Sequence, residues 1–440
     1  MALSAIRLLA YGLSFVSGLH ELIIQAMEQS NDTRLNLTMG EQFTSFIVTP
    51  LQEFASICPF VTVVLVIDAL DECPADIRPS FLSAISAGVP LLPSTVKVYL
   101  TSRPQVDVRQ CLKALEPLTI PVTVGIGMDD GDIEYFLRHE LERISKAAGL
   151  GKTWSTIQIK RDASALASKA GGLFQWARLL TSLLVNRVQP RDVVLRILDV
   201  KTSSTSEVNL DGLYTEALDI ALPRAEVASD INLGTVTLYR QVIGTVLAAK
   251  QPLTLSGICF LLKADSDDAR SAIQALLVNL GSVLVLHRIR GGALVVRVGH
   301  PSFRDYVTSQ ERCPPNWCID PHQASVQLGS RCFSVMATNL RRNICRMGSP
   351  SATNKDVSSG TIYQYIVTGL QYACIHAFTH VERDSGNLRM LETFLMEKLL
   401  EWLEAMTLMG FLDTAVELMQ QALAVLNQVC HTLTYFSATY

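Results

Sequence analysis

Two apolar runs that end abruptly in polar residues dominate the first third of the hydrophobic pattern. In the first run, Val61–Ile67 is mostly β-branched, and the carboxylates of Asp68, Asp71 and Glu72 follow it. Such a run predicts a strand buried on both faces, as strands of parallel sheets are. Open α/β sheets bind ligands beyond the carboxyl ends of their strands. The acids therefore indicate either a ligand site or a solvated acidic turn, and this segment alone leaves both open.

The second run predicts a neighbouring strand. It begins at Thr95 and ends in the polar residues Thr101, Ser102 and Arg103. One helix-length segment separates it from the first run, so we expect Val61–Asp68 and Val96–Thr101 to pair in parallel. Their polar ends then meet at the same edge of the sheet.

Other patterns are mainly helical. Leu118–Val124 predicts a third strand, and Pro121 suggests an edge position for it. Asp130–Ala148 carries apolar residues at helical spacing, and Ser282–Val298 predicts a hairpin turning at two glycines. The helices and hairpin between residues 235 and 310 are typical of a winged helix. We expect an α/β fold at first, followed by mostly α structure.

Composition excludes several classes of protein. Hydrophobic residues make up 49% of the 440-residue chain and charged residues 18%, which is typical of a globular protein and not of a disordered one. The net charge of −4 gives no electrostatic basis for binding nucleic acid. The longest apolar runs are too short to span a bilayer. Ten scattered cysteines predict free thiols in a reducing, cytoplasmic compartment.

Zinc binding is a weaker alternative that uses four of these candidate ligands. Cys313, Cys318, His322 and Cys332 lie within 20 residues of one another. Their spacing fits no familiar zinc finger or ribbon, so we do not expect a zinc site.

The two polar strand ends carry a resemblance to a known family. The segments VLVIDALDEC (Val64–Cys73) and KVYLTSRP (Lys97–Pro104) resemble the Walker B and sensor 1 strands of NACHT-type NTPases. These are signalling ATPases and GTPases of the STAND class, and fungal nephrocystin-3-like members are the most similar. The resemblance implies a partial parallel P-loop NTPase sheet, with Mg²⁺ and ATP, ADP or GTP as cofactors.

The same resemblance implies roles for individual residues. Asp68 would be the acid on the magnesium side, and Asp71 and Glu72 the following catalytic pair that orients or deprotonates water. Arg103 would sense the γ-phosphate. His300, within VGHPSFRDYV, would contact the β-phosphate of ADP and hold a closed state. We therefore expect Asp68, Asp71, Arg103 and His300 to converge on one cleft, where Arg103 pairs with Asp71 or Glu72 if nucleotide is absent.

Further segments follow in the family's order. They are ASKAGGLFQWARLL (Ala167–Leu180), LDGLYTEAL (Leu210–Leu218) and LLEWLEAMTLMG (Leu399–Gly410), which resemble the small helical segment, the connection to the winged helix and the helical region after it. The implied domains are 1–125 for the partial NTPase core, 126–225 for a small helical domain, 226–310 for the winged helix and 311–440 for a C-terminal helical region.

The phosphate-binding loop departs from the family pattern. No G-x-x-x-x-G-K-[ST] motif occurs before Asp68. The GKT at Gly151–Thr153 has Lys146 where the first glycine belongs, and it follows a predicted helix, so a glycine turn at a helix end explains it better. The chain then represents either an amino-terminally truncated gene model or a naturally degenerate paralogue.

Two functions remain open. One is a nucleotide-dependent signalling switch without efficient hydrolysis, which acts through protein partners or self-association. The other is a non-catalytic interaction scaffold that keeps the fold without the nucleotide. A hydrolase built on His300, Ser302 and Asp305 is rejected because residues so close in sequence do not easily form a relay. Phe174 and Trp176 are expected to be core aromatics.

Overall fold

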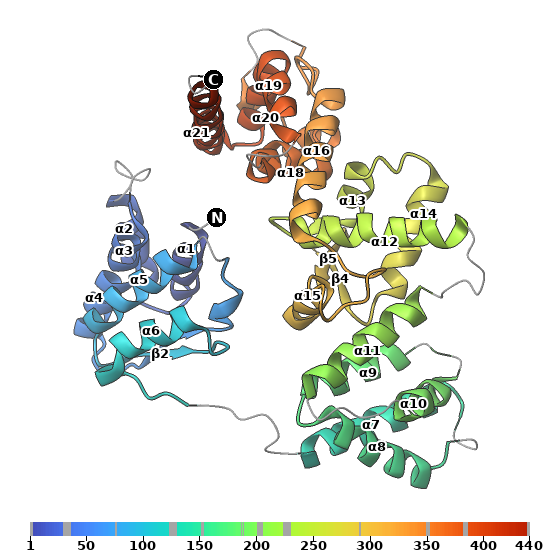
Figure 1. Cartoon of the computed structure of the whole chain (residues 1–440). Coiled ribbons are helices and arrows are strands. Elements are labelled where there is room, and N and C mark those ends of the chain that lie inside the picture. The colour runs from blue at the N-terminus through green and yellow to red at the C-terminus, as the bar shows by residue number, and fades with distance from the viewer. Residues whose placement is uncertain are drawn as a thin grey trace. The chain divides into compact units, whose positions relative to one another are not determined.

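The chain folds into two compact units, Met1–Val124 and Gly125–Tyr440 (Figure 1). Each unit has its own hydrophobic core. The structure is a computed structural model, which describes residues 3–29, 37–74, 77–122, 130–150, 154–185, 187, 189–199, 206–222, 230–289, 292–348, 353–381 and 386–437.

The first unit is built of short helices and two strands. In chain order they are α1 (Leu3–Leu13), α2 (His20–Gln29), α3 (Met39–Phe43), the π-helix η2 (Thr44–Val48), α4 (Thr49–Ile57), β1 (Val63–Ile67), η3 (Leu70–Glu72), α5 (Arg78–Gly88), η4 (Val89–Leu91), β2 (Val96–Leu100), α6 (Val106–Ala114) and η5 (Glu116–Leu118). The amino-terminal helices bury Ile6, Ala10 and Ile23, because these apolar residues recur at helical spacing.

The two strands pair in parallel, as the sequence predicts. The register runs from Val63 opposite Val96 to Ile67 opposite Leu100, and α5 provides the crossover between the strands. The polar residues that follow each strand therefore meet at one edge.

The expectation that β1 is buried on both faces was wrong. Val63 and Leu65 point into the core, whereas the residues Val64 and Val66 are 55% and 58% exposed. Tyr99 of β2, opposite Val66, is 61% exposed. The described helices of this unit cover only one face of the sheet. A continuous β-branched run cannot reveal that, because it reads the same whether one face or both are covered.

The predicted third strand does not form where the structure describes it. Leu118 ends the 3-10 helix η5, and residues 119–122 are irregular. Ile120 and Val122 are almost fully exposed, so this apolar segment lacks the packing that would hold a strand to the sheet. Residues 123–124 lie outside the described residues.

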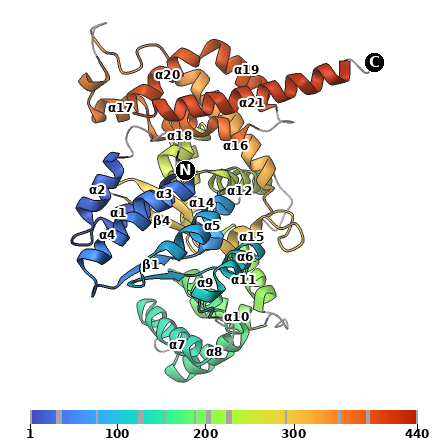
Figure 2. The same cartoon turned by 90° about the vertical axis from the view of Figure 1, so that its left-hand side faces the viewer.

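The second unit is mostly helical. Its elements are α7 (Asp130–Ala147), α8 (Thr156–Ala170), α9 (Phe174–Leu184), α10 (Pro190–Asp199), α11 (Ser206–Ala221), α12 (Asp230–Ala248), β3 (Leu253–Thr254), α13 (Leu255–Leu261), α14 (Asp267–Asn279), β4 (Leu284–Arg288), β5 (Leu294–Val298), α15 (Pro301–Val307), α16 (Pro321–Asn339), η6 (Asn354–Asp356), α17 (Ser359–Tyr365), α18 (Thr368–His376), η7 (Ala377–His380), α19 (Asn387–Glu397), α20 (Leu399–Leu408) and α21 (Leu412–Ser437), most of which Figure 2 labels.

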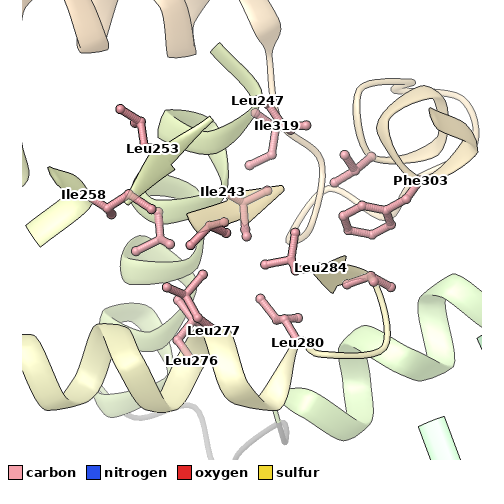
Figure 3. Close-up of a cluster of buried hydrophobic side chains, with 14 of the residues drawn as sticks. Ile243, Leu247, Leu253, Ile258, Leu276, Leu277, Leu280, Leu284, Phe303 and Ile319 are labelled. Carbon is pink, nitrogen blue, oxygen red and sulfur yellow. The ribbon is translucent and has the colours of Figure 1, made fainter. Parts of the chain in front are cut away.

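The expected hairpin is present in this unit. Strands β4 and β5 pair antiparallel, and β3 adds to the other edge of β5. The turn contains Gly292 at a φ of 84°, whereas Gly291 lies outside the described residues. Side chains from α12, α13, α14, β4 and α15 meet in a buried apolar cluster beside the hairpin (Figure 3). The winged-helix assignment and the four domain boundaries stay predictions.

Helix length and composition bear on the membrane question. Among the described residues, none of the helices combines the length and the apolar character needed to cross a bilayer.

Candidate functional site

The edge where β1 and β2 end is held together by Thr101. Its hydroxyl donates a hydrogen bond to the Asp68 carboxylate and accepts one from the backbone N–H of Ala69 at 2.8 Å. The backbone N–H of Thr101 also donates to Ile67 at 3.0 Å, and that of Leu70 donates to Thr101 at 2.9 Å. Thr101 therefore orients the exposed carboxylate of Asp68 at the sheet edge.

Ala69 turns the chain sharply after Asp68. Its φ of 52° and ψ of 50° lie in the left-handed region, which costs a non-glycine residue about 1–2 kcal/mol. The turn starts η3, in which Leu70 and Asp71 are buried and Glu72 is exposed. The strained residue thus separates an exposed acid, Asp68, from a buried one, Asp71.

Asp71 forms a close ion pair with Arg103. The Nε of Arg103 donates to Asp71 Oδ2 at 2.6 Å, and its backbone N–H donates to Oδ1 at 2.9 Å. The Asp71 side chain is 4% exposed and that of Arg103 is 51% exposed. Of the two partners anticipated for Arg103, the structure shows Asp71. Both carboxylate oxygens of Asp71 are engaged in this pair.

The pKa of Asp71 reflects two opposing influences. Burial raises the pKa, because the charged carboxylate loses hydration. The hydrogen bonds and positive charge of Arg103 outweigh burial, so the net result is a pKa below the ordinary value. Asp71 is therefore a charged anchor for Arg103 at neutral pH.

Arg78, which the sequence did not single out, extends this network. Its Nη1 donates to the backbone carbonyl of Asp71 at 3.1 Å, and its Nε donates to Asp107 Oδ2 at 2.6 Å. These bonds tie the start of α5 to η3 and to α6. No sequence motif identified Arg78, because its partners lie in other elements.

The donor set at the edge suits magnesium only in part. Mg²⁺ is usually held by one or two carboxylates, substrate phosphates and water, and exposed Asp68 meets the first requirement. The described residues contain no group of three or more His, Cys, Asp or Glu side chains arranged around a common ion position. No G-x-x-x-x-G-K-[ST] motif, whose backbone amides would hold the phosphates, precedes Asp68 in the 440-residue sequence.

His300 lies in the second unit, as the residue that caps α15. Its Nδ1 accepts a hydrogen bond from the backbone N–H of Ser302 at 3.2 Å and lies 2.6 Å from Ser302 Oγ. The Ser302 hydroxyl in turn lies 2.8 Å from the hydroxyl of Tyr214. The helix start thus brings the side chains of His300 and Ser302 together, and the expectation that His300, Ser302 and Asp305 form no hydrolase relay stays a prediction.

The predicted convergence of His300 with Asp68, Asp71 and Arg103 stays a prediction. Asp71 and Arg103 contact each other, and Asp68 lies three residues before Asp71 at the same edge. His300 belongs to a different unit.

The sequence did not identify Tyr214 as a residue near His300, because its contact with Ser302 spans 88 positions and leaves no local pattern.

Several weaker sequence hypotheses also have an outcome. Gly149 has a φ of 68° after α7, which confirms a glycine turn at the helix end, whereas residues 151–153 lie outside the described residues. Cys313 was one of the four candidate zinc ligands. Burial raises the pKa of its thiol to about 12, so the thiol is protonated at neutral pH. Trp176 is a core residue, and Phe174 is half exposed beside the ring of Phe136.

Comparison with known proteins gives one informative relationship. No family model matches the chain. The vegetative incompatibility protein HET-E-1 of Podospora anserina is 22% identical over 398 residues, which cover 84% of this chain. The chain spans only 27% of the length of that relative. The aligned share of this chain is larger than either unit, so the similarity includes residues of both.

Proposed function

We propose that the chain acts as a nucleotide-responsive signalling switch of the NACHT type, within the STAND class, with little NTP hydrolysis of its own. One observation carries the proposal: two parallel strands bring Asp68 and the Asp71–Arg103 pair to one edge of a sheet. Similarity to a fungal vegetative incompatibility protein across both units supports a signalling role.

In this proposal, each residue at the sheet edge has a separate role. Asp68, oriented by Thr101, would hold Mg²⁺, which when bound neutralises phosphate charge. Glu72 is exposed and suits a water-orienting role better than Asp71, whose carboxylate oxygens are both engaged. Asp71 instead holds Arg103 at the edge, where its guanidinium would respond to the γ-phosphate of ATP or GTP.

Weak hydrolysis is proposed because no phosphate-loop motif precedes Asp68 in the 440-residue sequence. Backbone amides and a lysine in that loop position the phosphates in related folds, and the sequence before Asp68 offers no such motif. Without precise positioning, Asp68 and Glu72 would contribute little to turnover.

His300 would make the switch bistable. It caps α15, directly after the hairpin of the proposed winged helix. A contact between His300 and the β-phosphate of ADP would favour a closed arrangement of the chain, and loss of that contact would favour another. Oligomerisation or a protein partner would then read out the arrangement.

A non-catalytic scaffold is the second candidate. The observation that favours it is the closed Asp71–Arg103 pair, which satisfies the buried carboxylate without any ligand. A chain that had lost nucleotide binding would retain such a pair for stability. The two candidates differ in whether nucleotide changes the state of the chain.

Hydrolysis tests the proposed inactivity. We expect the full chain to release phosphate from ATP or GTP no faster than Asp68→Asn, with Glu53→Gln as a control that removes an exposed acid from α4. A turnover that Asp68→Asn abolishes and Glu53→Gln retains would contradict the inactivity and indicate another phosphate cradle.

Binding separates the switch from the scaffold. A fluorescent ADP analogue with Mg²⁺ should bind the full chain, and Arg103→Gln and Asp68→Asn should weaken binding whereas Glu53→Gln should not. Light scattering with and without nucleotide then measures self-association. A titration that shows no binding, or the same dissociation constant for the wild type and all three variants, would favour the scaffold.

A further inference from the structure

A chain of hydrogen bonds leads from the interior of the second unit to His300. Ser302 lies 2.6 Å from the ring Nδ1 of His300, and Tyr214 lies 2.8 Å from the Ser302 hydroxyl. The chain therefore connects α11 and α15 through three side chains.

One backbone donor fixes the direction of these bonds. The N–H of Ser302 can only donate, and it points at His300 Nδ1 from 3.2 Å. Nδ1 must then be an unprotonated acceptor, so a neutral ring carries its proton on Nε2. Because Nδ1 has no proton, the Ser302 hydroxyl must donate to it, and Tyr214 must donate to Ser302.

Tyr214 is held rigidly enough to maintain this direction. It is 1% exposed, its ring stacks on that of Tyr306 at a centroid distance of 5.3 Å, and Phe303 packs beside it at the same distance. Burial raises the pKa of Tyr214, so its hydroxyl keeps the proton that it donates. An ion pair between Arg312 and Asp211, at 2.7 Å, holds another residue of α11.

We propose that Tyr214 and Ser302 are positioning residues for His300. They lock its Nε2–H tautomer, and they couple ligand binding at His300 to the contact between α11 and α15, the α11–α15 seam. An Nε2–H donor selects an acceptor, such as a phosphate oxygen, and disfavours a metal ion, which needs the nitrogen lone pair. The identity of that acceptor rests on the proposed function, whereas the locked tautomer does not.

The link to the seam follows from a shared hydroxyl. Turning the His300 ring toward a ligand changes its bond to Ser302, and Ser302 is also the acceptor for Tyr214. A shift at His300 therefore alters a bond that joins α15 to α11. Nearby, Thr215 and Tyr306 make another bond across the seam at 2.7 Å that does not include His300.

Nitrogen NMR of the full chain with ¹⁵N-labelled histidine tests the relay. The His300 signals are assigned by their loss in His300→Gln. In the wild type we expect the Nε2–H tautomer. Ser302→Ala should shift the Nδ1 resonance most, Tyr214→Phe should shift it less, and the matched control Thr215→Val should leave it in place. Circular dichroism confirms that each variant is folded.

The outcomes separate the relay from the proposed function. An Nδ1–H tautomer in the wild type, or equal shifts in Tyr214→Phe and Thr215→Val, would overturn the relay. Adding Mg-ADP should move the Nε2 resonance of His300. If the tautomer and variant shifts are as expected but Mg-ADP moves nothing, the relay holds and the nucleotide role of His300 fails.

Discussion

Two sites, one in each unit, treat ionisable side chains in opposite ways. At the sheet edge of the first unit, Asp71 stays charged because Arg103 pairs with it at 2.6 Å. In the second unit, His376 and His380 are buried beside Tyr372 without a carboxylate partner shown among the described residues. The first arrangement keeps charge at a place where a ligand can reach it, whereas the second removes charge from a core.

The buried histidines show how that removal is achieved. His380 Nε2 lies 2.9 Å from the Tyr372 hydroxyl, and its Nδ1 lies 3.0 Å from Ser325 Oγ. Burial, reinforced by the positive charge of Lys250, lowers the pKa of His376 to about 4 and that of His380 to about 3. Both rings are therefore neutral in the fold, and their proton affinity differs from that of the unfolded chain.

Mild acid should produce the largest difference between the units. Unfolding lets both histidines bind protons with a pKa near 6.5, so their stabilisation is complete above that pH and falls as pH drops toward 4. At pH 5 the two histidines together lower the free energy of unfolding of the second unit by about 4 kcal/mol relative to neutral pH. The pKa of Asp71 is lowered, so its contribution to the stability of the first unit is lost only at a pH below the range in which the histidines act. Hydrogen exchange resolved by peptide should show α16 and α18 opening before β1 and β2.

A variant isolates the cause of this acid sensitivity. His380→Gln keeps a polar side chain in the cluster but cannot titrate, so the pH dependence of exchange in α18 should weaken. The exposed His139 provides the control, because His139→Gln changes no buried histidine. If both variants lose the same pH dependence, the contrast drawn between the units is wrong.

Removing the charge partner of Asp71 should have the next largest effect. Arg103→Gln leaves a carboxylate that is 4% exposed without its cation, and we expect a loss of about 1–3 kcal/mol in the first unit, because Arg103 itself is half exposed. The pKa of Asp71 should rise in this variant, which carboxyl NMR measures. In an Asp71→Asn background, Arg103→Gln should cost much less.

Relief of backbone strain should give the smallest effect. Ala69→Gly accepts the φ of 52° without penalty and should stabilise the first unit by roughly 0.5 kcal/mol, after the greater freedom of glycine in the unfolded chain is subtracted. Ala87→Gly, at an exposed position of α5, should instead destabilise it by up to about 1 kcal/mol. Peptide-resolved exchange of both variants measures the difference, and a loss in both would show that Ala69 is not strained.

The sequence predicted the parts of the site that follow from the order of the two strands and from the polar residues at their ends. Apolar runs gave the parallel pairing of β1 and β2, and their polar ends correctly indicated that Arg103 would meet an acid. The sequence-based prediction failed for features that depend on tertiary packing. The exposed face at Val64 and the missing third strand both depend on what covers the sheet, and Tyr214 reaches Ser302 only through tertiary structure.

The spacing of the two strands also matters during synthesis. Val96 is made 33 residues after its partner Val63, which at ribosomal rates is a delay of roughly 2–7 s. Throughout that interval the nascent Val61–Ile67 segment, uncharged and rich in β-branched residues, has no strand to pair with and can associate with other chains. Asp68, Asp71 and Glu72 emerge directly behind it and act as gatekeepers by charge repulsion. We expect the acids at the sheet edge to lower the aggregation of the nascent chain by this repulsion, with or without a bound Mg-nucleotide.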